Sequence, residues 1–199
     1  MNSARYYVAL IFAIMMLPPV LVWMFIHPLS AKWRKVGPVG TYIFISIFVA
    51  AGIFLLWCIR DWLLSIEFGF KPFLSILASI FFIAAICFRI MWRKELRPTT
   101  LLGVPEIFGR NNSEELVTEG IYSYMRHPRY TEIGMVLVAA ALFSNYLVSY
   151  IVMLLYIPLI TIVVLLEERE LRDRFGELYE AYCMNVPRFI PQFRSHTDH

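Results

Sequence analysis

The sequence predicts an all-α integral membrane protein with about five transmembrane helices, and three observations support this fold class. Of the 199 residues, 59% are hydrophobic and 17% are charged, which is far from the near-even mix of soluble domains. Uncharged runs recur along the chain and approach the roughly 20 residues that a spanning helix needs. Basic residues concentrate in two of the connections between these runs, as the positive-inside rule requires. We therefore expect one multi-pass membrane domain over residues 1–199.

The first three transmembrane helices are expected at residues 6–26, 39–59 and 73–92, each of which is an apolar run. The first run follows Arg5, as the apolar region of a signal peptide would follow a basic residue. It is longer than such a region, however, and no small-residue cleavage site follows it. We therefore expect the first run to be retained as a helix.

The fourth and fifth helices are expected to form a hairpin at residues 130–147 and 149–166. From Ile133 to Leu166, 34 consecutive residues carry no charge. This length suits two paired helices of about 17 residues each rather than one span. Pro128 should open the fourth helix, because proline suits a first helical position and disfavours helix at the residue before it.

The distribution of charge predicts the orientation in the membrane. The first connection contains Lys32, Arg34 and Lys35 without an acid, and the third connection is richer still in basic residues. By the positive-inside rule both connections are cytoplasmic, and the amino terminus lies outside. Five spans then place residues 93–129 and 167–199 in the cytoplasm, and these segments are too long to be mere linkers.

The tail after the fifth span shows helical periodicity. Apolar side chains recur there at every third or fourth position, at Leu171, Phe175, Leu178 and Tyr182. This spacing predicts one apolar stripe on a helix that continues out of the fifth span. Pro187 should end that helix, because proline lacks the backbone donor.

Composition excludes two classes of site. The three cysteines have no CxxC spacing, so neither a disulfide framework nor a metal site is expected. The formal net charge of +3 comes from scattered Lys and Arg residues, so no nucleic-acid partner is expected either.

Polar residues at both ends of the predicted hairpin are candidates for a site. His127 should be the N-cap of the fourth helix, where free amides, the helix dipole and Arg126 favour an anion. The alternative is that Arg126 and Arg129 are interfacial anchors beside a plain helix start. Glu167 and Glu168 follow the fifth span, and adjacent helical residues diverge by about 100°. We expect one of these acids to face a cytoplasmic pocket, the alternative being a pair of solvated helix-end acids.

These polar sequences carry a family resemblance. LVTEGIY, RHPRY, EEREL, FGELYEAY and VPRFIP occur in this order over about 75 residues, from Leu116 to Pro191. The combined pattern resembles the isoprenylcysteine carboxyl methyltransferase family, and the predicted five-span size resembles its prokaryotic members. Glu132 departs from the pattern, since relatives often have glycine there, and the departure concerns how the start of the fourth helix packs.

The resemblance implies S-adenosyl-L-methionine as cofactor and S-adenosyl-L-homocysteine as product. It implies methyl transfer to the α-carboxylate of a carboxyl-terminal S-prenylcysteine or a similar lipid-linked carboxylate. Residues 93–129 and 167–199 would be the cofactor-binding segments, and Arg126 and Glu167 the catalytic residues. The implied cofactor-binding residues are Leu116, Val117, Glu119, Gly120, Tyr122, Tyr124, His127, Pro128, Tyr130 and Glu168.

Elementary chemistry agrees with this implied reaction. A carboxylate is already ionised at pH 7, so methyl transfer to it needs positioning rather than a general base. Arg126 or another nearby cation would orient the acceptor, whereas an acid would repel it. A prenyl chain favours lipid, so we expect a prenylated cysteine or another lipid-linked substrate to enter from the bilayer, with membrane lipids as the other partners.

Three alternatives stay open at this point. A phospholipid N-methyltransferase that acts on phosphatidylethanolamine has similar carboxyl-terminal motifs, and there an acid would serve as base. NADPH-dependent sterol or isoprenoid reductases also share related sequences, but in larger proteins. A non-enzymatic membrane scaffold would use the same polar residues as anchors and caps.

Overall fold

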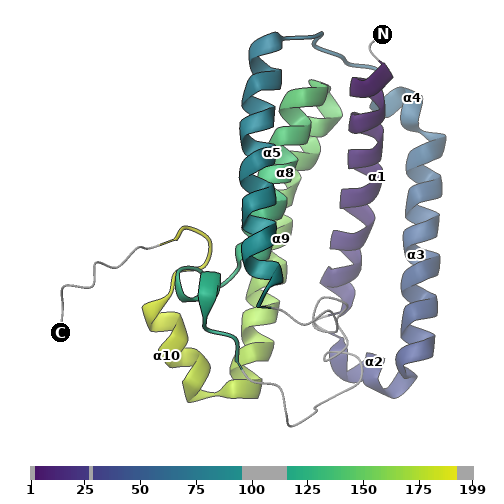
Figure 1. Ribbon diagram of the computed structural model, residues 1–199. Helices are drawn as coiled ribbons and strands as arrows, with labels where there is room; N and C mark the ends of the chain where they lie inside the picture. Colours follow the sequence, from purple (N-terminus) through teal and green to yellow (C-terminus); the bar gives the residue numbers. More distant parts are fainter. Residues whose placement is uncertain (1–2, 27–28, 96–115, 192–199) are drawn as a thin grey trace, which may run out of the picture.

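A computed structural model describes residues 3–26, 29–95 and 116–191, and it is a helical bundle (Figure 1). The five long helices run alternately along the bundle: α1 (Ser3–Ile26), α3 (Pro38–Cys58), α5 (Pro72–Arg93), α8 (Pro128–Ser144) and α9 (Leu147–Phe175). The short elements are α2 (Ser30–Val36), α4 (Arg60–Leu63), the 3-10 helix η1 (Gly120–Ser123) and α10 (Glu177–Asn185). The described residues contain no strand, which confirms the all-α class.

Each predicted span overlaps one long helix. Three helical segments are long and apolar enough to cross a membrane: Val39–Cys58, Pro72–Arg93 and Leu147–Phe175. Within the described part of α1, which has 24 residues in all, the apolar helical segment is Ala4–Pro18, and α8 has 17 residues, so neither segment reaches the length of a usual span. The membrane class is supported, but the number of five spans is not confirmed.

The main core lies where α1, α8 and α9 meet. Phe12, Leu137 and Val163 come from these three helices, and all are buried in one apolar cluster. The outer helices bury little of their surface. Ile47 on α3 is 64% exposed and Ile83 on α5 is 61% exposed. Helices with apolar outer faces of this size are stable in lipid rather than in water.

The hairpin between α8 and α9 turns at Asn145 and Tyr146, slightly before the boundary at residue 148 that the sequence predicts. Asn145 follows α8 with a φ of 55°, in the left-handed region that asparagine tolerates, and α9 begins at Leu147. The turn lies at the same end of the bundle as the amino terminus (Figure 1). We call this the far end.

The opposite end collects α2, η1 and α10 (Figure 1), and we call it the site end. The prediction that one continuous helix runs from the fifth span through the tail is wrong. Gly176 ends α9 with φ 55° and ψ −128°, a conformation that glycine adopts without steric cost, and α10 starts at the next residue. Leu178 consequently lies outside a shared stripe and is 71% exposed. Val186 ends α10 just before Pro187, as the sequence predicts.

Candidate active site

Backbone hydrogen bonds attach the carboxyl-terminal tail to the start of α8. The amide of Arg126 donates to the carbonyl of Pro187 at 2.8 Å, and the amide of His127 donates to that of Arg188 at 3.0 Å. One turn later, the hydroxyl of Thr131 donates to the carbonyl of Phe189 at 3.3 Å. Segments about 60 residues apart in sequence therefore form one structural unit, because these buried backbone groups need partners.

Glu168 is the centre of this unit. Its side chain is fully buried and accepts hydrogen bonds from Arg126 at 2.8 Å and from Arg188 at 2.9 and 3.0 Å. The Nε2 atom of His127 lies 3.2 Å from the same carboxylate, and Arg172 lies 3.5 Å away. A buried carboxylate with this many charge-assisted bonds has little capacity left for a ligand. Glu168 therefore holds the tail in place.

Arg126 has a similar structural role. One guanidinium nitrogen donates to the carbonyls of Cys183 at 2.8 Å and Val186 at 2.7 Å, and another donates to Glu168. Both carbonyls lie at the end of α10, where helix carbonyls lack intrahelical partners. The side chain is 7% exposed. Its predicted catalytic role stays a prediction, and the contacts in the structure are those of a residue that positions α10 and the tail.

Glu167 faces a different environment from that of Glu168, as adjacent helical residues must. It is half-buried and accepts a hydrogen bond from the hydroxyl of Tyr130 at 2.7 Å. Tyr130 is fixed in turn, because Tyr156 donates to its carbonyl at 2.9 Å. One described hydrogen bond leaves a carboxylate with free lone pairs. Of the two neighbouring acids, Glu167 is therefore the one with capacity for a cationic ligand.

The 3-10 helix η1 places Tyr122 beside this acid. Gly120 opens η1 with a φ of 59°, in the left-handed region that favours glycine, and the side chain of Glu95 packs close to the position that a Cβ would take. Tyr122 is buried against Trp92, and its carbonyl accepts from Tyr182 at 2.7 Å. Burial raises the pKa of its hydroxyl, and the negative charge of Glu167 raises it further. Tyr122 therefore stays a neutral phenol.

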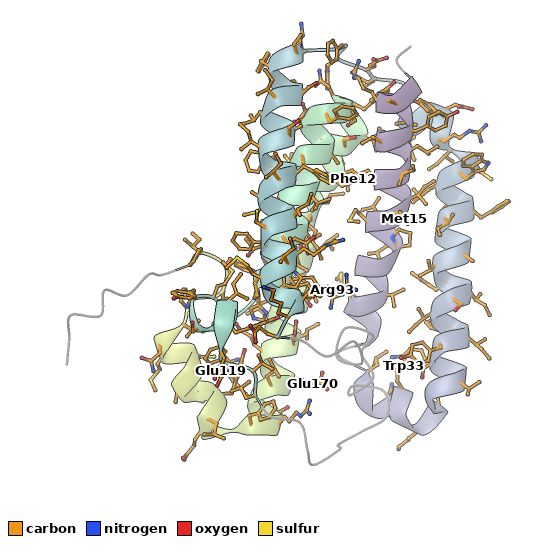
Figure 2. The ribbon with its side chains drawn as sticks, viewed as in Figure 1. Phe12, Met15, Trp33, Arg93, Glu119 and Glu170 are labelled. Atoms are coloured by element: carbon orange, nitrogen blue, oxygen red, sulfur yellow. The ribbon has the colours of Figure 1, made fainter. Side chains whose placement is uncertain are left out.

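The remaining residues that the sequence predicts in the site differ in how exposed their side chains are. Val117 packs against the cluster around Trp92 and Leu116 is half-buried, whereas Glu119 and Tyr124 are exposed. Figure 2 shows Glu119, with Arg93 and Glu170, at the site end. His127 is the N-cap of α8 and Pro128 its first residue, as predicted. The structure brings these residues to one end of the bundle, while their cofactor-binding roles stay predictions.

Sequence reasoning missed several members of this site. Arg188 and Arg172 complete the set of side chains around Glu168, and the VPRF sequence was the available signal for Arg188.

Glu132, on α8, is a further buried acid that sequence reasoning did not place in a contact. It is 1% exposed and accepts from Arg89 at 2.8 Å and from the indole of Trp92 at 3.1 Å. The departure from the family pattern at Glu132 therefore creates a buried link between α8 and α5. No group of metal-ligating residues occurs within the described ranges.

Comparison with known proteins identifies relatives of this region. Residues 73–178 match the family described as "Phospholipid methyltransferase". Over 87 residues the chain is 36% identical to a Schizosaccharomyces pombe protein named "Protein-S-isoprenylcysteine O-methyltransferase". That alignment covers 41% of this chain and 35% of the relative, so the chain matches about a third of the relative's length. The family match includes most of α5 and all of η1, α8 and α9, whereas most of α10 and the tail around Arg188, which also belong to the site, lie beyond it.

Proposed function

Because this chain belongs to the phospholipid methyltransferase family, we propose that it transfers a methyl group from S-adenosyl-L-methionine to a lipid-linked carboxylate. The proposed acceptor is the α-carboxylate of a carboxyl-terminal S-prenylcysteine or a similar lipid. The name of the fission yeast relative supports this acceptor class. The proposed site is the site end of the bundle.

The observation that carries the proposal is the environment of Glu167. A half-buried carboxylate, bonded to Tyr130 and close to the neutral phenol of Tyr122, suits a ligand that carries positive charge next to apolar atoms. S-adenosyl-L-methionine has an ammonium group, a sulfonium group and a ribose diol. The residues present fit these groups, with Glu167 and Glu119 for the ammonium and the diol and the tyrosine rings for the sulfonium.

The other predicted residues complete this proposed binding surface. Leu116 and Val117 would cover the apolar part of the cofactor, and Gly120 would let the backbone approach it closely. His127 and Pro128 start α8, whose first-turn amides and helix dipole favour the cofactor carboxylate. When bound, the cofactor supplies an electrophilic methyl group. Glu168 would contribute by holding the tail against this surface rather than by touching the ligand.

The protein's own contribution to methyl transfer is positioning. An ionised acceptor carboxylate needs no proton removed, so catalysis depends on holding an oxygen in line with the methyl–sulfur bond in a site that excludes water. Arg126 contributes by fixing α10 and the VPRF segment beside the start of α8. Glu167 contributes by orienting the cofactor, because its charge would repel an acceptor carboxylate at close range.

The proposed topology puts this site in the cytoplasm and the amino terminus outside, which follows from the basic first and third connections. A prenylated acceptor would enter from the bilayer, since each buried methylene favours lipid by about 0.8 kcal/mol. The membrane lipids around α3 and α5 are the other expected partners. Photolabelling with a lipid-borne prenyl analogue tests this entry route, and labels confined to water-exposed loops would contradict it.

The decisive experiment measures transfer of labelled methyl groups by the purified protein. N-acetyl-S-farnesylcysteine, phosphatidylethanolamine and a reaction without acceptor are compared. Base-labile label on the farnesylcysteine is the expected result, because methyl esters hydrolyse in base. The absence of both methyl transfer and cofactor binding would overturn the proposal.

Phosphatidylethanolamine is included because the family description names phospholipids, which makes N-methylation the second candidate. An amine must lose a proton before it accepts a methyl group, and Glu167 would then gain a role as base. Base-stable label on the phospholipid alone would establish that reaction in place of carboxyl methylation.

A further inference from the structure

Arg129 differs from the arginines that contact Glu168 or Glu132 in having no acidic partner among the described residues. Arg126, Arg172 and Arg188 all contact Glu168, and Arg89 contacts Glu132. For Arg129, no carboxylate in residues 3–26, 29–95 or 116–191 lies within ion-pair distance. The side chain is nevertheless half-buried at the start of α8.

Arg129 lies in the first turn of α8, between Pro128 and Tyr130, and so at the start of the helix that carries part of the proposed site. Its charge also acts on the hydroxyls of Tyr122, Tyr130 and Tyr156, which come from η1, α8 and α9. Tyr130 gives its hydrogen bond to Glu167, and Tyr156 gives its own to the carbonyl of Tyr130. The hydroxyls of Tyr130 and Tyr156 are therefore already paired, and within the described residues no ion pair occupies the guanidinium of Arg129.

The chemistry of this position favours an anionic amphiphile. A guanidinium that is half-buried at a membrane boundary gains from an anion, and its planar fork of donors matches a carboxylate. One turn further along α8, Ile133 packs against the apolar core of α1 and α9. A ligand with a charged head and an apolar tail can therefore contact Arg129 and the membrane-spanning part of α8 together.

We propose that Arg129 binds the carboxylate of the methyl acceptor, an inference that rests on the proposed function. The alternative ligand is the carboxylate of the cofactor. A guanidinium close to a sulfonium is disfavoured by like charge unless an anion lies between them, and an acceptor carboxylate held in line with the methyl group would supply that anion. Arg129 thus selects carboxylate acceptors over neutral or cationic ones.

The test compares binding of N-acetyl-S-farnesylcysteine with binding of its carboxamide, which has the same tail and no charge. We expect the wild type to prefer the acid, and Arg129→Gln to reduce this preference about tenfold or more while carboxamide binding stays unchanged. Arg129→Lys should restore part of the preference, because it restores the charge without the planar fork. Lys35→Gln is the control, since Lys35 is an exposed cation on α2 at the site end and lies outside the proposed cofactor-binding segments.

Cofactor affinity, measured in the same variants, separates the outcomes. An unchanged acid preference in Arg129→Gln would overturn the role of Arg129 and leave the proposed function intact. Weaker binding of S-adenosyl-L-methionine, with the acid preference retained, would assign Arg129 to the cofactor instead. If the wild type binds the acid and the carboxamide equally, or binds neither, the proposed acceptor class itself is wrong.

Discussion

The far end and the site end of the bundle both bury a charged side chain, but they surround it differently. At the far end Arg5 is 2% exposed, and it donates to the carbonyl of Ser144 at 2.9 Å and to Glu67 at 2.7 Å. At the site end Glu168 is fully buried among three arginines and a histidine. One end buries a cation with one acid, and the other buries an acid with an excess of cations.

This difference shows which end contains charged groups that can still bind a ligand. Polar groups at the far end mostly pair with the nearby backbone: Phe68 donates to the carbonyl of Asn145, and Asn145 donates to that of Gly69. The site end pairs its buried acid with arginine and histidine side chains, but among the described residues it leaves Glu167 with one hydrogen bond and Arg129 without an ion pair, both half-buried. A buried ion pair is therefore a structural feature at both ends, and the incompletely paired groups distinguish the candidate site.

The largest expected effect comes from Glu168→Gln. Loss of this charge leaves Arg126 buried without a counter-charge, which should destabilise the protein by about 3 kcal/mol. Arg172 and Arg188 reach solvent, so they add little to this cost. Thermal unfolding in detergent measures the change, and proteolysis of the tail should accelerate in parallel. Glu177→Gln, at an exposed position on α10, is the control, and equal stability of the two variants would contradict the central role of Glu168.

A smaller loss is expected from Arg5→Met at the far end. Glu67 is 28% exposed and can be rehydrated, so the loss of its partner should cost about 2 kcal/mol of unfolding free energy. Cofactor affinity of the folded protein should not change, because the two ends share no polar contact among the described residues. Isothermal titration at a temperature where the variant stays folded checks this. Weaker cofactor binding would show that the ends are coupled.

Glu167→Gln and Tyr130→Phe test the binding capacity at the site end. The first removes the proposed counter-charge of the cofactor, and its Kd for S-adenosyl-L-methionine should rise about tenfold, because a hydrogen bond to a charged group contributes roughly 1.5–3 kcal/mol. The second removes only the group that orients the acid, so its effect should be smaller. A smaller effect of Glu167→Gln than of Tyr130→Phe would contradict direct contact between Glu167 and the cofactor.

Glu132→Gln should have the smallest effect. The amide can still accept from the indole of Trp92, and Arg89 is 58% exposed and can be solvated without its partner. We expect a loss of less than about 1 kcal/mol in unfolding free energy, measured in the same thermal assay. A loss as large as that of Glu168→Gln would mean that the link between α5 and α8 supports the bundle as strongly as the tail network does.

Much of the fold could be predicted from the sequence because membrane helices are encoded locally. Long uncharged runs specify helices, since backbone groups in lipid must bond within their own segment. Pro128 and Pro187 mark where helices begin or end, because proline lacks a backbone donor. Gly176 was missed as a helix end, because the apolar spacing across it matched one continuous helix and the glycine's backbone angles are not visible in that pattern.

The sequence by itself determined that this is a helical membrane protein and which segments carry polar chemistry at one end of the predicted hairpin. It also determined that Glu167 and Glu168 face different ways, because a helix rotates by about 100° per residue. Only the tertiary structure decided which acid is committed to the tail, since Arg126, His127 and Arg188 reach Glu168 from segments distant in sequence. The pairing of charged groups depends on distances in space, and no local pattern encodes them.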